Sequence, residues 1–159
     1  MWSTAAGAGR LVLWRASDTP LNVARAALAE LVGTAVFVML SALSSVHDLD
    51  LSAAALANGL FITVCVFATI RESGAHLNPS VTVALAATGL GNVGIARAMV
   101  YLLAEFVGAI VGAGIARALA PDFSVSAARH ALCRARDSDA TCVSVLQAFA
   151  AEAFGTAVL

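Results

Sequence analysis

Apolar residues dominate three long stretches of the chain, which polar, charged or helix-breaking residues separate. The stretches cover residues 22–44, 52–70 and 95–119. Each is about as long as the roughly 20 apolar residues that a helix needs to cross a hydrocarbon core of ~30 Å. The pattern therefore predicts three membrane-spanning helices. A fourth apolar stretch begins near Val143 and continues to Leu159.

A break and restart of helical pattern lies between the second and third stretches, at Ser-Gly-Ala-His-Leu-Asn-Pro-Ser-Val-Thr, residues 73–82. Asn78 is a favourable N-cap, because its side-chain oxygen can accept a hydrogen bond from an unpaired N–H of the next turn. Pro79 suits the first helical position, where no N–H is needed. A helix over 79–88, ended by Gly89, spans roughly half of a ~30 Å core. Irregular backbone at that depth implies a cavity that satisfies it.

Composition narrows the class of protein. Hydrophobic residues make up 60% of the chain, charged residues 12%, and the mean hydropathy is +0.89. Soluble domains have roughly 45–50% apolar and 25% charged residues. The composition indicates a membrane protein, and the net charge of −1 argues against a nucleic-acid partner. Gly-x-Ser-x-Gly, His-Glu-x-x-His and Walker boxes are absent, so the sequence predicts no catalytic residues, no metal site and no cofactor.

An internal repeat relates the two ends of the apolar region. Residues 28–37 align without gaps on residues 150–159, and six of ten positions are identical, among them Glu30 and Glu152. An odd number of predicted spans separates the copies, so the second copy starts on the opposite side of the membrane. Channels and transporters use such inverted repeats to build a site at the bilayer midplane.

The predicted organisation has four parts. In chain order they are an N-terminal tail (1–21), a first repeat (22–119), an extracytoplasmic loop (120–142) and the start of a second repeat (143–159), which we expect to be truncated. Arginine placement favours a cytoplasmic N-terminus, because Arg25, Arg71 and Arg97 fall on the side of the tail, whereas the first loop has none. The balance is five arginines against four on the other side.

Residues 73–82 resemble the first Asn-Pro-Ala box of the major intrinsic protein family, the aquaporins and glycerol facilitators. Ser80 stands where that family usually has Ala. Residues 29–34 resemble the Ala-Glu-Phe motif of its first helix, and a third-helix motif has Glu105 where the family commonly has Gln. The resemblance covers residues 25–159 and implies an all-α, aquaporin-like inverted-repeat channel that forms a homotetramer and conducts water or small neutral solutes passively through the lipid bilayer.

The resemblance also implies roles for individual residues. The pore-lining and selectivity residues would be Asn78, Pro79, Ser80, His76, Asn58, Ile62 and Phe37, and the buried acids Glu30 and Glu152 would hold the re-entrant loops. His76 is a pore-side group or a loop brace. Water-selective members commonly have an aromatic residue at the position of Asn58, so Asn58 predicts a more polar and wider opening. The alternative is that Asn58 bonds a neighbouring helix.

Two other readings remain open at the level of sequence. A secondary transporter also uses broken helices and inverted repeats. Alternatively, the chain is a non-conducting fragment or an assembly partner, because a pore of this kind needs two half-helices and residues 1–159 contain one. The solute itself is not specified by these residues.

Overall fold

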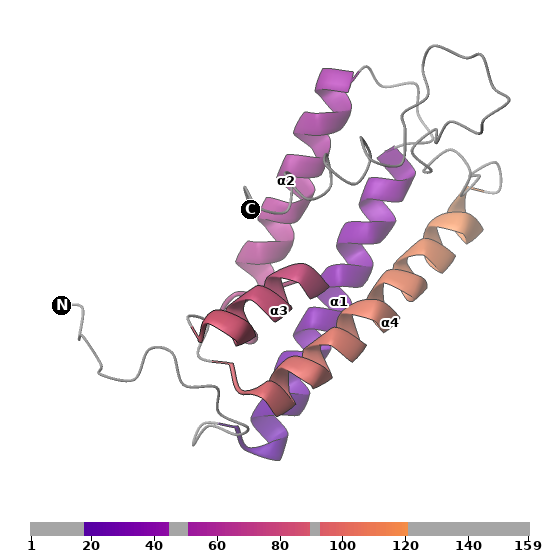
Figure 1. The fold of residues 1–159 in the computed structure, drawn as a ribbon. Coiled ribbons are helices and arrows are strands. Elements are labelled where there is room, and N and C mark those ends of the chain that lie inside the picture. Colours follow the sequence, from indigo (N-terminus) through magenta and orange to yellow (C-terminus); the bar gives the residue numbers. More distant parts are fainter. Residues whose placement is uncertain (1–17, 45–50, 90–92, 121–159) are drawn as a thin grey trace, which may run out of the picture.

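The computed structural model describes residues 18–44, 51–89 and 93–120, and all regular structure in these ranges is α-helical. The helices are α1 (Pro20–Ser44), α2 (Leu51–Thr69), α3 (Pro79–Thr88) and α4 (Ile95–Leu119) (Figure 1). The all-α fold class is confirmed for this part of the chain. Residues 1–17 of the predicted tail, residues 121–142 of the predicted loop and the second repeat lie outside the described residues.

Three of the helices, α1, α2 and α4, are long and apolar enough to cross a membrane. Large apolar side chains point outward on each of them, for example Leu28 on α1, Phe67 on α2 and Ile110 on α4. A helix that is apolar on all sides belongs in a core or in lipid. The outward apolar surface therefore fits a hydrocarbon environment.

The first helix starts two residues before the predicted range of 22–44. The hydroxyl oxygen of Thr19 accepts a hydrogen bond from the backbone N–H of Asn22, and Pro20 takes the first helical position. Thr19-Pro20 is thus a start signal of the same kind as Asn78-Pro79, a capping residue followed by proline. The apolar pattern alone does not reveal the signal at Thr19-Pro20. The range predicted for α2 is displaced by one residue, and α3 and α4 have the predicted bounds.

Helices α1 and α4 lie side by side (Figure 1) and form the most extensive helix contact of the described residues. Glycines of α4 face the backbone of α1. A Cβ atom on Gly108 would meet the carbonyl oxygen of Leu31, and one on Gly112 would meet that of Ala35. Small residues let the helix backbones approach closely in membranes, where packing replaces the hydrophobic effect as the source of association. Gly108 and Gly112 thus allow the backbone of α4 to lie against that of α1.

The half-helix α3 is capped at both ends. At its start, the side-chain oxygen of Asn78 accepts a hydrogen bond from the backbone N–H of Ser80 at 2.9 Å. At its end, Gly89 adopts the left-handed conformation with φ of 70°, which a residue without Cβ adopts at low cost. The predicted cap and stop are confirmed. Figure 1 shows α3 beside the middle of α4, which it contacts.

Gly112→Val should destabilise the α1–α4 pair, because the added side chain collides with backbone that has no rotamer to change. We expect a loss of about 1–3 kcal/mol, the usual cost of overpacking. Unfolding in mixed micelles with increasing denaturing detergent measures it. Gly114→Val is the matched control, since nothing lies within 4 Å of the position of its Cβ. Equal losses in the two variants would contradict the contact.

Candidate pore-lining site

The Glu30 carboxylate holds the backbone that precedes the half-helix. Glu30 is fully buried on α1. Its Oε1 accepts a hydrogen bond from the N–H of His76 at 3.0 Å, and its Oε2 accepts one from the N–H of Leu77 at 2.6 Å. Successive backbone N–H groups that converge in this way form an anion-binding concavity. A buried carboxylate is tolerated here because both oxygens are bonded.

This convergence requires an unusual backbone. Ala75 has φ of 55° and Leu77 has φ of 51°, values that cost a residue with a Cβ on the order of 1–3 kcal/mol each. Hydrogen bonds to a charged group contribute about 1.5–3 kcal/mol each and offset this cost. The side chain of Leu77 is buried against Gly33, where a Cβ would lie 2.6 Å from Leu77 Cδ2. Gly33 therefore makes room for the re-entrant segment.

A second polar chain links that segment to α4. The Nδ1 atom of His76 lies 2.8 Å from Thr82 Oγ1, and the Thr82 hydroxyl donates to Glu105 Oε1 at 2.6 Å. All three residues are buried. The imidazole thus braces the loop against α3 and, through Thr82, against α4.

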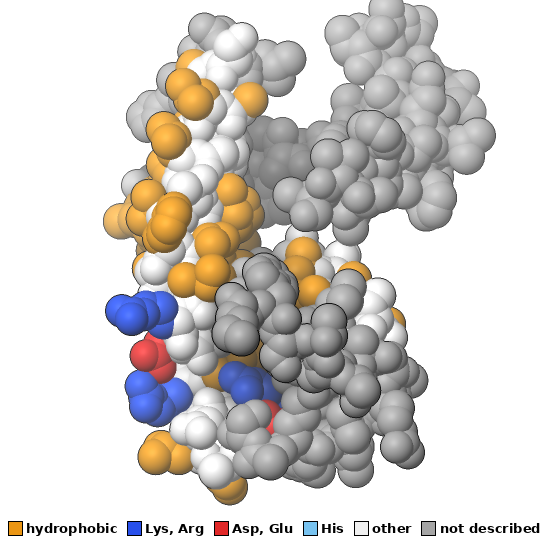
Figure 2. Space-filling model, turned by 90° about the vertical axis from the view of Figure 1, so that its left-hand side faces the viewer, with side chains coloured by type: hydrophobic (Ala, Val, Ile, Leu, Met, Phe, Trp, Pro, Cys, Tyr) orange, Lys and Arg blue, Asp and Glu red, His pale blue; other side chains and the backbone are white. Residues whose placement is uncertain are grey.

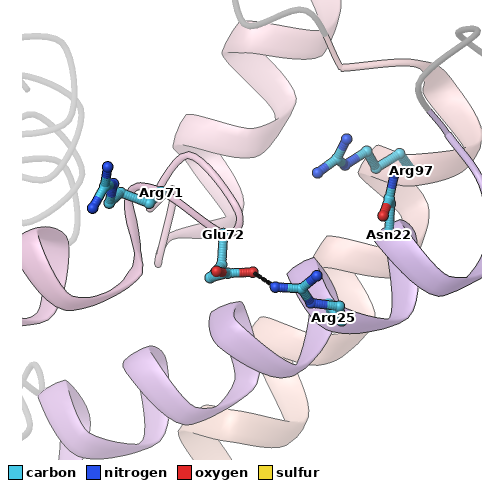
Figure 3. A pocket seen from close by; sticks show the side chains of 5 residues that line it. All are labelled: Asn22, Arg25, Arg71, Glu72 and Arg97. Atoms are coloured by element: carbon cyan, nitrogen blue, oxygen red, sulfur yellow. Dashed lines mark hydrogen bonds and ion pairs between the residues drawn. The ribbon is translucent and has the colours of Figure 1, made fainter.

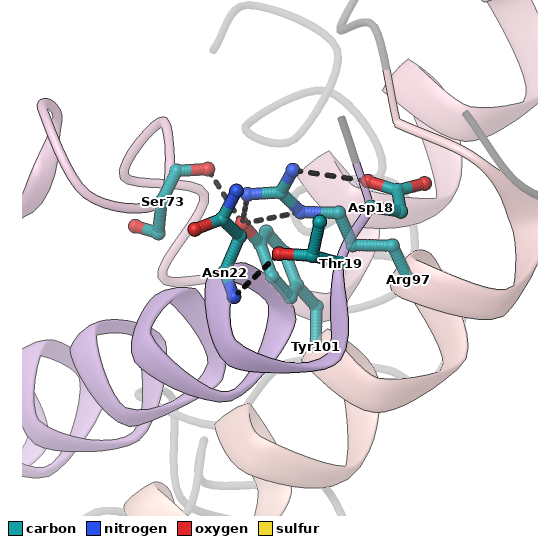
Figure 4. A network of polar contacts seen from close by, with 6 residues as sticks. All are labelled: Asp18, Thr19, Asn22, Ser73, Arg97 and Tyr101. Carbon is teal, nitrogen blue, oxygen red and sulfur yellow. Dashed lines mark hydrogen bonds and ion pairs between the residues drawn. The ribbon is translucent and has the colours of Figure 1, made fainter. Parts of the chain in front are cut away.

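Tyr101 anchors the beginning of the segment, as Figure 4 shows. Its hydroxyl donates to the carbonyl oxygen of Ser73 at 2.8 Å and accepts hydrogen bonds from Arg97 Nη2 at 2.9 Å and Nε at 3.1 Å. Arg97 also pairs with Asp18 at 3.2 Å. The ring of Tyr101 meets that of His76 edge to face, with centroids 5.1 Å apart. The re-entrant segment is therefore supported from α1 and α4 together.

A cavity of about 440 Å³ lies between α1, α2 and the re-entrant segment. This volume lies within the range of roughly 300–1,000 Å³ that is usual for small-molecule sites. Five residues that the sequence singled out line it together: Phe37, Asn58, Ile62, His76 and Asn78. Pro79 and Ser80, in the first turn of α3, are not among the lining residues, although Asn78 and Val81 on either side of them are. Glu152 lies outside the described residues.

Within the part of the chain that the structure describes, the Asn58 side chain is hydrogen-bonded to its own helix. Its Nδ2 donates to the carbonyl oxygen of Ala54, one turn earlier in α2, at 2.9 Å. This hydrogen bond uses one of the two amide hydrogens and none of the acceptor capacity of the side chain. Asn58 thus presents polar groups to the cavity while its orientation is held.

The remaining lining residues were not predicted from the sequence. They are Gly59, Val66, Ala75, Leu77 and Val81. Helical spacing could have identified two of them, since Val66 follows Ile62 by four residues and Val81 follows Asn78 by three. Thr82, which joins His76 to Glu105, gave no signal, because its role depends on which helix α3 packs against.

Three apolar helices long enough to span a membrane and a capped half-helix beside a cavity define a helical, multi-pass membrane protein. The family model for the major intrinsic protein matches residues 17–159, and the chain belongs to that family. It is therefore an integral membrane protein, and the family consists of passive channels and not of enzymes.

Curated relatives agree with this assignment. The chain is 34% identical to aquaporin-4 of Mus musculus over 105 residues, which are 61% of this chain and 32% of that protein. It is 41% identical to aquaporin-5 of Sus scrofa over 107 residues, which are 61% of this chain and 37% of that protein. It is 37% identical to probable aquaporin PIP2-8 of Oryza sativa subsp. japonica over 103 residues, which are 60% of this chain and 36% of that protein. The chain spans about a third of the length of the curated relatives it matches.

Glu30→Gln should loosen the re-entrant segment. An amide has one acceptor oxygen, and its NH2 group would face a backbone N–H in place of the second oxygen. A buried donor without a partner costs about 1–3 kcal/mol, so we expect amide exchange at His76 and Leu77 to accelerate roughly tenfold or more. Exchange at Ser80, whose N–H is bonded by the Asn78 cap, serves as the internal reference. Uniform acceleration at all three amides would indicate general destabilisation instead.

Proposed function

We propose that the protein is a passive membrane channel for water or small uncharged solutes. The observation that supports this most directly is the cavity between α2 and the re-entrant segment, lined by Asn78 at the start of the half-helix. Family membership supports the same proposal. The identity of the solute, the oligomeric state and the orientation are proposals about the whole protein.

Backbone geometry supplies hydrogen-bond acceptors to the cavity. The N–H groups of His76 and Leu77 point to Glu30 on α1. In a trans peptide the preceding carbonyl points the opposite way, and none of the described peptide bonds is cis. The carbonyl groups of Ala75 and His76 are thereby turned away from Glu30, and both residues line the cavity. A solute with O–H or N–H groups would donate to them.

Asn78 supplies the matching donor. Its side-chain oxygen is used by the Ser80 N–H, so its NH2 group is available to a water or hydroxyl oxygen. The positive end of the α3 dipole lies at the same place and disfavours cations and protons. A neutral solute that both donates and accepts hydrogen bonds fits this combination, whereas an ion would lose its hydration without an opposite charge to replace it.

The solute class depends on Asn58. A polar side chain at this place in the lining, where its orientation is held by the bond to Ala54, favours an opening that admits polyols or urea as well as water. We further propose a homotetramer with a cytoplasmic N-terminus. The orientation is supported by Arg25, Arg71 and Arg97, which lie at one end of the helix bundle.

Flux through proteoliposomes tests the proposal. The protein expressed from its complete reading frame should give passive, weakly temperature-dependent swelling in response to an osmotic gradient. Saturable uptake that depends on an ion gradient would instead identify a secondary transporter. Absence of flux at normal insertion would favour the assembly-partner alternative.

Asn78→Asp should reduce water flux or admit cations, because a carboxylate keeps the N-cap but replaces the amide donor with a charge. We expect a change on the order of tenfold in flux or in cation conductance, the worth of one charge-assisted contact. Swelling and conductance are recorded on the same preparation. Asn78→Ser keeps the cap without adding a charge, so it should lower flux without cation leak. Wild-type flux and conductance in Asn78→Asp would contradict the role of the amide.

Asn58→Phe should lower glycerol and urea permeability more than water permeability, because a ring would narrow the cavity at the wall formed by α2. The ratio of solute to water permeability is the measurement, and we expect a several-fold decrease. Leu60→Phe is the control, since Leu60 is exposed on the same helix and does not line the cavity. An unchanged ratio in Asn58→Phe would show that Asn58 does not control passage.

A further inference from the structure

A second cavity lies at the end of the bundle where α1 and α4 begin and α2 ends. It has a volume of about 320 Å³ and is lined by Asn22, Arg25, Arg71, Glu72 and Arg97 (Figure 3). Its three arginines come from three separate parts of the chain: α1, the turn after α2, and the first turn of α4. In the view of Figure 2, arginine and acidic side chains gather in the lower part of the molecule, next to hydrophobic side chains.

The charges of this cavity are not balanced by the described residues. Arg25 pairs with Glu72 at 2.8 Å, and Arg97 pairs with Asp18 at 3.2 Å. No ion pair to Arg71 is found in the described ranges. Three guanidinium groups therefore face two carboxylates. The Arg25–Glu72 pair is also exposed, with 61% and 48% of its side chains accessible, and exposed pairs stabilise little. An incoming anion would compete with Glu72 at low cost.

Arg97 is held in position before any ligand arrives. Its guanidinium bonds Asp18 and twice bonds the hydroxyl of Tyr101, and it lies 5.3 Å from the centre of that ring (Figure 4). Its side chain is 15% accessible. A guanidinium whose rotamers are already restricted loses less entropy when it binds an anion. The cavity thus combines one fixed arginine with two adaptable ones.

The lengths of the helices put the cavity near the depth of lipid headgroups. The part of α1 after Arg25 is roughly 28 Å long at 1.5 Å per residue, close to the ~30 Å of a hydrocarbon core. Arg71 and Glu72 directly follow the last turn of α2. Basic pockets between spanning helices at this level are suited to anionic headgroups. Guanidinium groups match the oxygens of a phosphate in bidentate geometry.

We propose that this cavity binds one phosphate group, provided either by an anionic phospholipid headgroup or by free phosphate at the membrane surface. Arg71 and Arg25 approach the phosphate oxygens, Arg97 supplies the positioned third charge, and Glu72 is the competing anion. The site is separate from the pore-lining cavity, so the proposal does not depend on channel activity.

Thermal unfolding of the purified protein in neutral detergent tests binding, because a ligand that binds the folded state raises the unfolding temperature. One arm titrates inorganic phosphate. The other titrates phosphatidic acid against phosphatidylcholine, with native mass spectrometry to detect retained lipid. Stabilisation by phosphatidic acid alone assigns the site to a headgroup, and stabilisation by inorganic phosphate identifies a soluble ligand. If neither stabilises the protein more than phosphatidylcholine does, the proposal is wrong.

Three variants locate the binding. Arg71→Gln should weaken the apparent affinity about fivefold to tenfold. Arg117→Gln is the matched control, because Arg117 is exposed at the opposite end of α4, and it should leave the affinity unchanged. Glu72→Gln should strengthen binding by several-fold, since it releases Arg25 and removes a negative charge. This gain cannot arise from misfolding. Equal effects of Arg71→Gln and Arg117→Gln, or weaker binding in Glu72→Gln, would overturn the site.

Discussion

The two hydrogen bonds between the Glu30 carboxylate and the N–H groups of His76 and Leu77 are the interaction on which the pore-lining side of the molecule depends. They explain why a carboxylate is buried in an apolar helix, and why two residues with side chains accept a left-handed backbone. They also set the direction of the carbonyl groups on the opposite side of the segment. One buried charge thus determines the backbone conformation, the supply of acceptors and the position at which α3 begins.

Close contact between α1 and α4 is the second constraint. Glycines at 108 and 112 bring α4 against the backbone of α1, which places Glu105 and Tyr101 within reach of the same segment that Glu30 holds. Glu105 accepts from Thr82, and Tyr101 donates to Ser73. Glu105 stands where the family commonly has Gln, and its Oε2 has no hydrogen-bond partner among the described residues. A carboxylate can only accept when ionised, whereas an amide can also donate. The hydrogen bond that Glu105 accepts from Thr82 at Oε1 is one that the oxygen of a glutamine could also accept.

Sequence reasoning predicted the elements better than the contacts between them. The length of the apolar stretches and the Asn78-Pro79 signal were sufficient for the helices and for the capped start of α3, because capping and span length are local properties. Five lining residues could be named in advance through the family resemblance. Thr82, Tyr101 and Arg97 could not, since their roles arise from how α3 and α4 meet. The start of α1 at Pro20, two residues before the predicted range, was missed, although Thr19-Pro20 is a start signal. The prediction used the apolar pattern, which contains no information about capping residues. The copy of Glu30 at Glu152 remains a prediction.

The space that Gly33 leaves beside α1 has a consequence for how the protein is made. Glu30 and Gly33 lie one turn apart on α1, and together they receive the backbone of His76 and the side chain of Leu77. During synthesis α1 leaves the ribosome before the segment that it receives, because it precedes that segment in the chain. The acceptor oxygens and the space are therefore present when residues 74–78 leave the ribosome. The N–H groups of this segment would otherwise lie unpaired in lipid, and they can form hydrogen bonds as soon as the segment enters the membrane. The order of the two elements along the chain therefore favours correct membrane insertion.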